Sequence, residues 1–195
     1  MEWLEKKKAE CDQYLDEQME ALWSVSKYIH ANPELNFEEV KACKVQCEFL
    51  ERYGFSVKKG IGTLDTAFEA SYSKTSSGPV IAIISEYDAL PIGHACGHNL
   101  IACSALGAAI ELKKYMEETE TAGTLKVIGT PAEEGGGGKI ILIKQGIFEG
   151  VDAVLMMHPT SDTTRLAGAC LSSKRYKVTY HGVSAHAGSH PDNGT

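Results

Sequence analysis

The segment Pro79–Ser85 most constrains the fold, because its core, Val-Ile-Ala-Ile-Ile, is apolar at every position. A strand of this kind is buried on both faces, as in a parallel sheet covered by helices. A second apolar strand is expected at 153–157 and a third at 124–129, with helices at 99–118 and 139–145. This alternation of strands and helices predicts an α/β fold in which a mixed, largely parallel sheet is flanked by helices.

The N-terminal part of the chain predicts two helices and two short strands. Apolar residues recur at helical spacing over 3–31, and Asn32-Pro33 ends that helix. A second helix is expected over 38–53, followed by strands near 55–58 and 64–72. These elements precede the apolar strand and are expected to cover the same sheet.

The pattern of the sequence changes after Leu166. Residues 174–182 alternate polar and apolar side chains, which predicts a half-exposed strand. We therefore expect a catalytic domain over 1–170 and the beginning of an α+β lid or dimerisation domain over 171–195. The sequence stops at 193–195, just after a glycine-rich turn, so it is interpreted as the N-terminal half of a longer protein.

Charge and composition exclude several partners. The formal net charge of -7 argues against nucleic acid or an anionic membrane surface, since both select basic patches. The charged first residues do not predict a signal peptide, and no membrane span is expected, since no stretch approaches the roughly 20 apolar residues that one needs. Its scattered cysteines are interpreted as reduced thiols, so a cytoplasmic location is expected. The cysteines are Cys11, Cys43, Cys47, Cys96, Cys103 and Cys170.

Unusual polar residues follow the expected carboxyl ends of three strands. Ligands of open α/β sheets gather at this edge, so we expect these side chains on one rim. They are Glu86, Asp88, His94, Cys96 and His98 after the first strand, Glu133 and Glu134 after the second, and His158 after the third.

This set of side chains suits a borderline-soft divalent ion, with Zn²⁺ the first expectation and Mn²⁺ the second. Cys96 and His98 are two residues apart, so one turn can direct both to a single centre. The positive end of the following helix and a nearby metal are expected to lower the pKa of the Cys96 thiol. Glu133 and Glu134 can divide the roles of proton acceptor and ligand, while Asp88 can orient a ligand histidine.

Each of these residues also has an ordinary interpretation when taken alone. Glu133 and Glu134 can form a solvated acidic turn, and His158 can be a loop histidine with satisfied hydrogen bonds. Asp88 can simply form a turn. The role of His94 stays open.

Five motifs occur in order along the chain. They are Ser-Glu-Tyr-Asp-Ala-Leu-Pro, Gly-His-Ala-Cys-Gly-His-Asn, Pro-Ala-Glu-Glu-Gly-Gly-Gly-Gly, Met-Met-His-Pro and Gly-Val-Ser-Ala-His-Ala-Gly. Together they resemble the aminoacylase/carboxypeptidase-type co-catalytic metallopeptidases of clan MH, in the amidohydrolase branch near p-aminobenzoyl-glutamate hydrolase and a dipeptidase-like group. The resemblance extends from about Val25 onward.

The resemblance implies a zinc-exopeptidase-like catalytic domain holding two divalent ions. It implies Glu133 as the catalytic general base and Asp88 as the carboxylate that supports the metal site. It also implies that His186, in the lid domain, stabilises the tetrahedral oxyanion, and that the protein is a homodimer through that domain. The metal ligands it implies are Cys96, placed to bridge the ions, His98, Glu134 and His158.

The sequence departs from the family pattern at two positions. Glu86 stands where the wider family has the histidine of a His-x-Asp motif, so its role as a ligand stays open. Asn99 replaces an aspartate that follows the ligand histidine in many amidohydrolases, which is expected to alter the surroundings of His98. The family also supplies a further histidine ligand from a C-terminal segment, so the activity of this chain alone stays open.

The residues and the resemblance together favour metal-dependent hydrolysis of C–N amide bonds in small N-acyl amino acids or dipeptides. One rival is a cysteine hydrolase in which Cys96 is the nucleophile and His98 the base. A second is a nucleotide-binding loop at 135–139, although isoleucine follows Lys139 where a phosphate-binding loop has serine or threonine. A third is a non-catalytic relative that binds metal or ligand without turnover.

Overall fold

The computed structural model describes residues 2–75, 77–161, 163–166, 172, 174, 176–179 and 181–194. The chain forms two compact units, Met1–Thr160 and Ser161–Thr195, and each is described by itself. The predicted boundary at residue 170 falls inside the second unit and stays a prediction. Cys170 lies outside the described residues.

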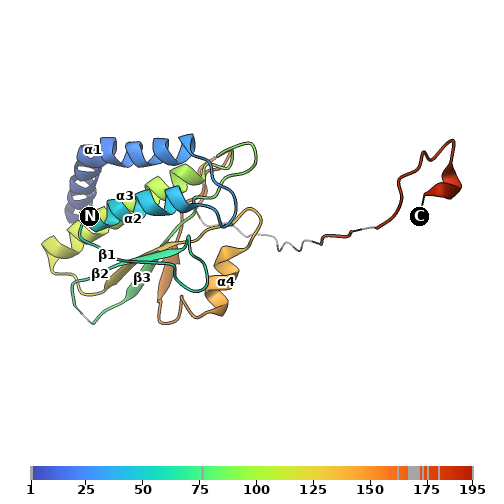
Figure 1. The fold of residues 1–195 in the computed structure, drawn as a ribbon. Helices are drawn as coiled ribbons and strands as arrows, with labels where there is room; N and C mark the ends of the chain where they lie inside the picture. Colours follow the sequence, from blue (N-terminus) through green and yellow to red (C-terminus); the bar gives the residue numbers. More distant parts are fainter. Residues whose placement is uncertain are drawn as a thin grey trace. The chain divides into compact units, whose positions relative to one another are not determined.

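The first unit contains four helices and five strands among its described residues (Figure 1). The expected helices and strands are confirmed there, with shifts of a few residues at their ends. Their bounds are α1 (Glu2–Ala31), α2 (Val40–Arg52), β1 (Ser56–Lys59), β2 (Phe68–Ser73), β3 (Val80–Ser85), α3 (His98–Thr119), β4 (Thr124–Gly129), α4 (Gly138–Lys144) and β5 (Ala153–Leu155).

The five strands form one sheet in the order β1-β2-β4-β3-β5. β3 pairs in parallel with both β4 and β5, whereas β2 is antiparallel to β1 and β4. Only β2 therefore runs against the others, which confirms the mixed, largely parallel sheet. Ser85 is level with Gly129 in the register, so the chain leaves β3 and β4 at the same edge.

Helices cover both faces of the sheet. α1, α2 and α3 lie on one face and α4 lies on the other (Figure 1). Along β3 the side chain of Ile83 packs into the first core, and those of Ala82 and Ile84 pack into the second. β4 does the same with Val127 and Ile128, so the expected burial of these strands on both faces is confirmed. Among the described residues, no helix has the length and apolar character needed to cross a bilayer.

Two expectations about strands were wrong. The apolar strand expected at 153–157, β5, is exposed, with 50% of Val154 and 57% of Leu155 accessible, because it pairs only with β3 and lies at the edge of the sheet. The described residues within 174–182 do not form the expected strand. A strand needs a neighbour to satisfy its backbone groups, and none of the described residues pairs with this segment.

The thiols described by the structure are free. Those of Cys43 and Cys47 lie one helical turn apart on α2, both buried in the core, with 4.0 Å between their sulfur atoms. Both cysteines therefore serve as core residues.

The buried face of α3 is expected to carry much of the stability. Leu106→Ala removes a fully buried side chain from the first core, which should cost about 2–5 kcal/mol of unfolding free energy. Leu112→Ala, on the same helix but 37% exposed, is the matched control and should cost clearly less. Urea denaturation measures both values, and equal losses would contradict the core described above.

Candidate metal centre

His98 begins α3 with its imidazole buried, only 1% exposed. Gly97 precedes it at φ 78°, a left-handed conformation that glycine adopts without steric cost. The Nδ1 atom of His98 lies 3.0 Å from the Asp88 carboxylate and 2.9 Å from the Asp88 carbonyl oxygen. Both neighbours are acceptors, so Nδ1–H donates and the lone pair of the neutral ring lies on Nε2, as a metal-ligating histidine requires.

Three carboxylates surround the Nε2 atom of His98. Oxygens of Glu86, Glu134 and Glu133 lie 3.6, 3.7 and 3.9 Å from it. Within the described part of the chain, His98 Nε2 and Glu86 Oε2 are buried without a hydrogen-bond partner. Because buried polar atoms normally have partners, these two point to a cation between them.

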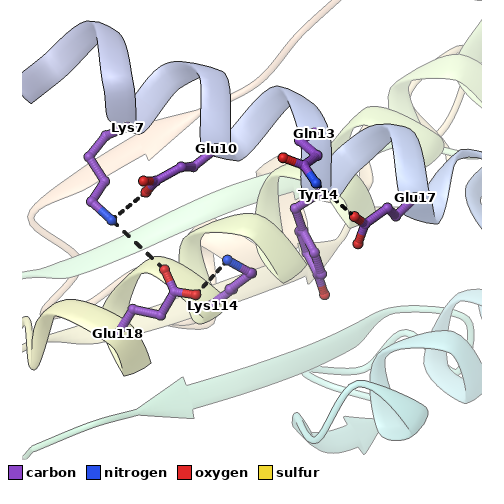
Figure 2. Close-up of a pocket in the computed structure, with 7 residues that line it drawn as sticks. All are labelled: Lys7, Glu10, Gln13, Tyr14, Glu17, Lys114 and Glu118. Carbon is purple, nitrogen blue, oxygen red and sulfur yellow. Dashed lines mark hydrogen bonds and ion pairs between the residues drawn. The ribbon is translucent and has the colours of Figure 1, made fainter.

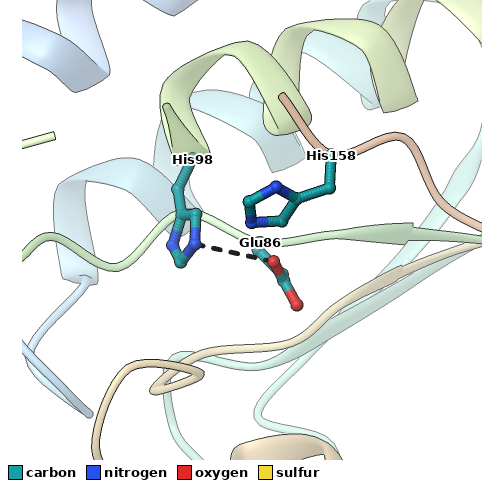
Figure 3. Close-up of side chains that lie close together, drawn as sticks. All are labelled: Glu86, His98 and His158. Carbon is teal, nitrogen blue, oxygen red and sulfur yellow. Dashed lines mark ion pairs between the residues drawn. The ribbon is translucent and has the colours of Figure 1, made fainter. Parts of the chain in front are cut away.

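His158 joins this group from the third strand end. Its imidazole, the His98 ring and the Glu86 carboxylate offer three ligand atoms within 4.8 Å of one another (Figure 3). His158 Nδ1 lies 2.7 Å from the carbonyl oxygen of Pro159, which leaves Nε2 as its lone-pair nitrogen. Polar residues that follow β3, β4 and β5 therefore meet at one edge of the sheet.

Asp88 connects two of these strand ends. One carboxylate oxygen accepts from His98, and the other accepts the backbone N–H of Glu134 at 2.9 Å. Burial by itself raises the pKa of Asp88, but the hydrogen bonds from His98 and Glu134 outweigh burial and lower it. Conversely, burial opposes the charged form of His98, but the hydrogen bond to Asp88 and the negative charges of Asp88, Glu86 and Glu134 together outweigh burial and raise the pKa of the imidazole.

Cys96 lies beside the cluster, and its thiol is hydrogen-bonded to the Glu134 carboxylate. That bond, burial, and the charges of Glu134 and Glu133 raise the pKa of Cys96 to about 11. The carboxylates thus outweigh the positive end of the helix, while the lowering of the Cys96 pKa expected from a nearby metal stays a prediction. A thiol with so high a pKa is a poor nucleophile, which weighs against the cysteine hydrolase. Its role as a metal ligand stays a prediction.

Glu86, whose role the sequence left open, is a central member of the cluster. Its side chain is 1% exposed; one oxygen faces His98 and the other pairs with the ammonium of Lys139 in the first turn of α4. The Lys139 ammonium thus pairs with a carboxylate and not with a phosphate group, which argues against the hypothesis of a nucleotide-binding loop. In the sequence, Glu86 and Asp88 are two residues apart at the end of a strand, and this spacing indicated that both side chains point the same way.

Two other polar residues of the same motif lie outside the cluster. The amide of Asn99 donates to the Ser26 hydroxyl at 2.9 Å and so ties α3 to α1. Both ring nitrogens of His94 are buried, and neither has a hydrogen-bond partner among the residues that the structure describes; its ring centroid lies 6.3 Å from that of His30. Burial lowers the pKa of His94, which favours the neutral ring.

His186 belongs to the second unit, and only its local geometry is described. Its Nδ1 atom accepts the backbone N–H groups of Gly188 and Ser189, each at 3.1 Å. The proton of the neutral ring is therefore on Nε2, which leaves that nitrogen as a donor.

A groove of about 380 Å³ between α1 and α3 lies away from this centre. Lys114, in its wall, is 16 residues along α3 from His98, or about 24 Å at 1.5 Å per residue. The charged side chains that line this groove pair with one another, Lys7 with Glu10 and Lys114 with Glu118 (Figure 2). A groove whose charges are neutralised internally offers little to a charged ligand.

The fold and the cluster at its strand ends are typical of the α/β domain of metallopeptidases. Comparison with known proteins agrees: residues 82–192 match the model of peptidase family M20/M25/M40. The chain belongs to this family, which confirms the resemblance drawn from the five motifs.

Individual relatives are consistent with this assignment. The chain is 38% identical to the Xaa-Arg dipeptidase of Mus musculus over 96% of its own length and 46% of that protein's. It is 33% identical to one of the subunits of p-aminobenzoyl-glutamate hydrolase from Escherichia coli K12, over 91% of this chain and 41% of that one. The chain therefore spans less than half the length of these relatives.

A solved structure shares the fold. It is a Bacillus subtilis protein described as a dinuclear metal binding peptidase from the M20 family, with a TM-score of 0.66 and 32% identity. The match covers 73% of this chain and 43% of the other.

The Asp88 bridge is expected to control metal affinity. In Asp88→Asn a single side-chain oxygen remains, so either His98 loses its side-chain acceptor and keeps only the Asp88 carbonyl, or the Glu134 amide loses its acceptor. The affinity for Zn²⁺ should fall about 10- to 100-fold, as for other residues that orient ligands. Competition with a chromophoric chelator measures it, with exposed Asp65→Asn as the control. Unchanged affinity in Asp88→Asn would show that the bridge does not organise the site.

Proposed function

We propose that this chain carries the metal-binding half of a hydrolase that cleaves C–N amide bonds in small N-acyl amino acids or dipeptides. The observation that carries the proposal is the buried His98 Nε2, which has no hydrogen-bond partner among the described residues and has three carboxylates within 3.9 Å. The names of the relatives, a dipeptidase and an amide hydrolase, support this reaction class.

The donor set fits the two divalent ions that the family resemblance implies. Imidazole, carboxylate and thiol together suit Zn²⁺ first and Mn²⁺ second. We assign Cys96, His98, Glu134 and His158 as the ligands. When bound, such ions acidify water and polarise a carbonyl group.

Glu133 is assigned as the general base. Its side chain is 40% exposed, against 17% for Glu134, and so is the more open of the two to a substrate. Glu133 takes a proton from the attacking water as oxygen adds to the amide carbon. It then returns that proton to the leaving nitrogen as the C–N bond breaks, and a carboxylic acid and an amine result.

His186 is assigned to the oxyanion. Its Nδ1 accepts from backbone amides, which leaves Nε2–H to donate to the negatively charged oxygen. We also propose a homodimer formed through the lid domain, as in the resembling family. A cytoplasmic location is proposed because the closely spaced thiols of Cys43 and Cys47 are not joined. No feature of the cluster favours a non-catalytic role.

The role of Glu133 is tested by Glu133→Gln in the longest native protein that contains this sequence. Turnover of p-aminobenzoyl-glutamate and of an Xaa-Arg dipeptide should fall about 100- to 10,000-fold. Zinc content should stay unchanged, because Glu133 is not assigned as a ligand. Glu149→Gln, at an exposed glutamate that is not a member of the cluster, is the control and should retain full turnover. Full turnover in Glu133→Gln would refute the assignment.

Metal removal separates this mechanism from thiol chemistry. Dialysis against a chelator should abolish turnover, and Zn²⁺ or Mn²⁺ should restore it. Turnover that survives chelation but is lost after thiol alkylation would instead favour the cysteine hydrolase.

A further inference from the structure

Glu39 is a buried carboxylate for which the proposed function gives no role. It immediately precedes α2 and is fully buried, and it accepts three hydrogen bonds. Its Oε1 atom accepts the backbone N–H groups of Phe37 and Ala132, each at 2.9 Å, and its Oε2 atom accepts the Thr66 hydroxyl at 2.9 Å. These donors satisfy a group that would otherwise be costly to bury.

Helix capping does not explain this carboxylate. The side chain of Glu39 makes no capping hydrogen bond to α2, although Glu39 occupies the N-cap position. The exposed amides of α2 are instead bound by Glu34, which accepts from Lys41 and Ala42 at 2.9–3.1 Å. The side chain of Glu39 therefore serves a contact elsewhere in the fold, 93 residues away at Ala132.

Ala132 occupies a position where such a contact matters. It has a φ of +57°, in the left-handed region that residues with a β-carbon rarely adopt. Its carbonyl oxygen accepts the amides of Gly136, Gly137 and Gly138 at 3.1, 2.7 and 3.4 Å. The loop from β4 to α4 is thus wound around Ala132, which directly precedes Glu133.

The segment 36–39 also holds this loop from a second side. A β-carbon at Gly135 would collide with the Asn36 side chain, and one at Gly136 would collide with the Phe37 ring. The two glycines are therefore in close contact with the segment whose Glu39 binds Ala132.

The two amides on either side of Glu133 are both held by buried carboxylates. The N–H of Ala132 donates to Glu39, and the N–H of Glu134 donates to Asp88. Asp88 also holds His98, so the geometry between Glu133 and His98 depends on these two carboxylates together.

We propose that Glu39 is a positioning residue that, through the Ala132 amide, sets where the Glu133 carboxylate lies relative to His98. This inference rests on the proposed role of Glu133 as general base. The described partners of Glu39 are two backbone amides and a hydroxyl, all of them uncharged donors. What matters is therefore that the side chain is long enough to bring an acceptor oxygen to the Ala132 amide, and not that it carries a charge. A misplacement of about 1 Å at a reacting group can cost about 100-fold in rate.

Two substitutions separate the effect of the length of the Glu39 side chain from the effect of its charge. Glu39→Gln keeps an oxygen for both amides, and its NH₂ can donate to the Thr66 hydroxyl, so kcat should stay within about threefold of wild type. Glu39→Asp keeps the charge but is one methylene shorter, so it loses the Ala132 bond, and kcat should fall about 10- to 100-fold with little change in KM.

Two control variants address stability and the third hydrogen bond. Glu34→Ala removes the other carboxylate that binds backbone amides in the same segment, and it should lower stability without changing kcat. Thr66→Val removes the hydroxyl partner of Glu39 but leaves the Ala132 bond intact, and it should retain kcat.

Hydrogen–deuterium exchange of the peptide covering residues 130–138 gives a readout that requires no activity. Protection of the Ala132 amide should be lost in Glu39→Asp and kept in Glu39→Gln. The same pattern of protection in a protein that hydrolyses no amide would refute the proposed function, and with it the effect of Glu39 on kcat, while still showing that Glu39 holds the Ala132 amide. Retained protection and kcat in Glu39→Asp, or their loss in Glu39→Gln alone, would overturn the proposal.

Discussion

The metal centre depends on one buried carboxylate, that of Asp88. It binds the Nδ1 of His98 and the backbone amide of Glu134, and so it connects the chain after β3 to α3 and to the chain after β4. By holding the proton of His98 on Nδ1, it turns the lone pair of Nε2 toward the glutamates. The same bonds lower the pKa of Asp88 and raise that of His98, so each group stabilises the charge of the other.

The sheet makes this arrangement possible. Because β3, β4 and β5 run in parallel, residues far apart in the sequence leave the sheet at one edge. The two cores on its faces hold the strands in place, so the cluster is built on rigid elements. The loop around Ala132 adds a second level of control, since glycines let it wind tightly and Glu39 holds its start.

Local patterns predicted the fold well, because the apolar run of β3 and the Ala-rich start of α3 leave few alternatives. The burial of β5 was mispredicted, since an apolar run does not reveal whether a strand is central or at an edge. Within the site, spacing at strand ends identified the polar residues that meet. Spacing did not identify the Glu86–Lys139 pair or the Asn99–Ser26 contact, because each joins residues that are distant in sequence. It also did not give the direction of the Cys96 pKa shift, because that direction depends on the summed effect of the neighbouring carboxylates.

The most direct test of the account is the metal content per chain, measured by elemental analysis on wild type and Cys96→Ser in the longest native protein that contains this sequence. The proposed two-metal centre predicts about two ions per wild-type chain and a clear loss in the variant, because Cys96 is assigned as one of the residues that would hold them. No bound ion in either protein after metal-replete purification would contradict the central claim that the buried His98 cluster is a metal centre.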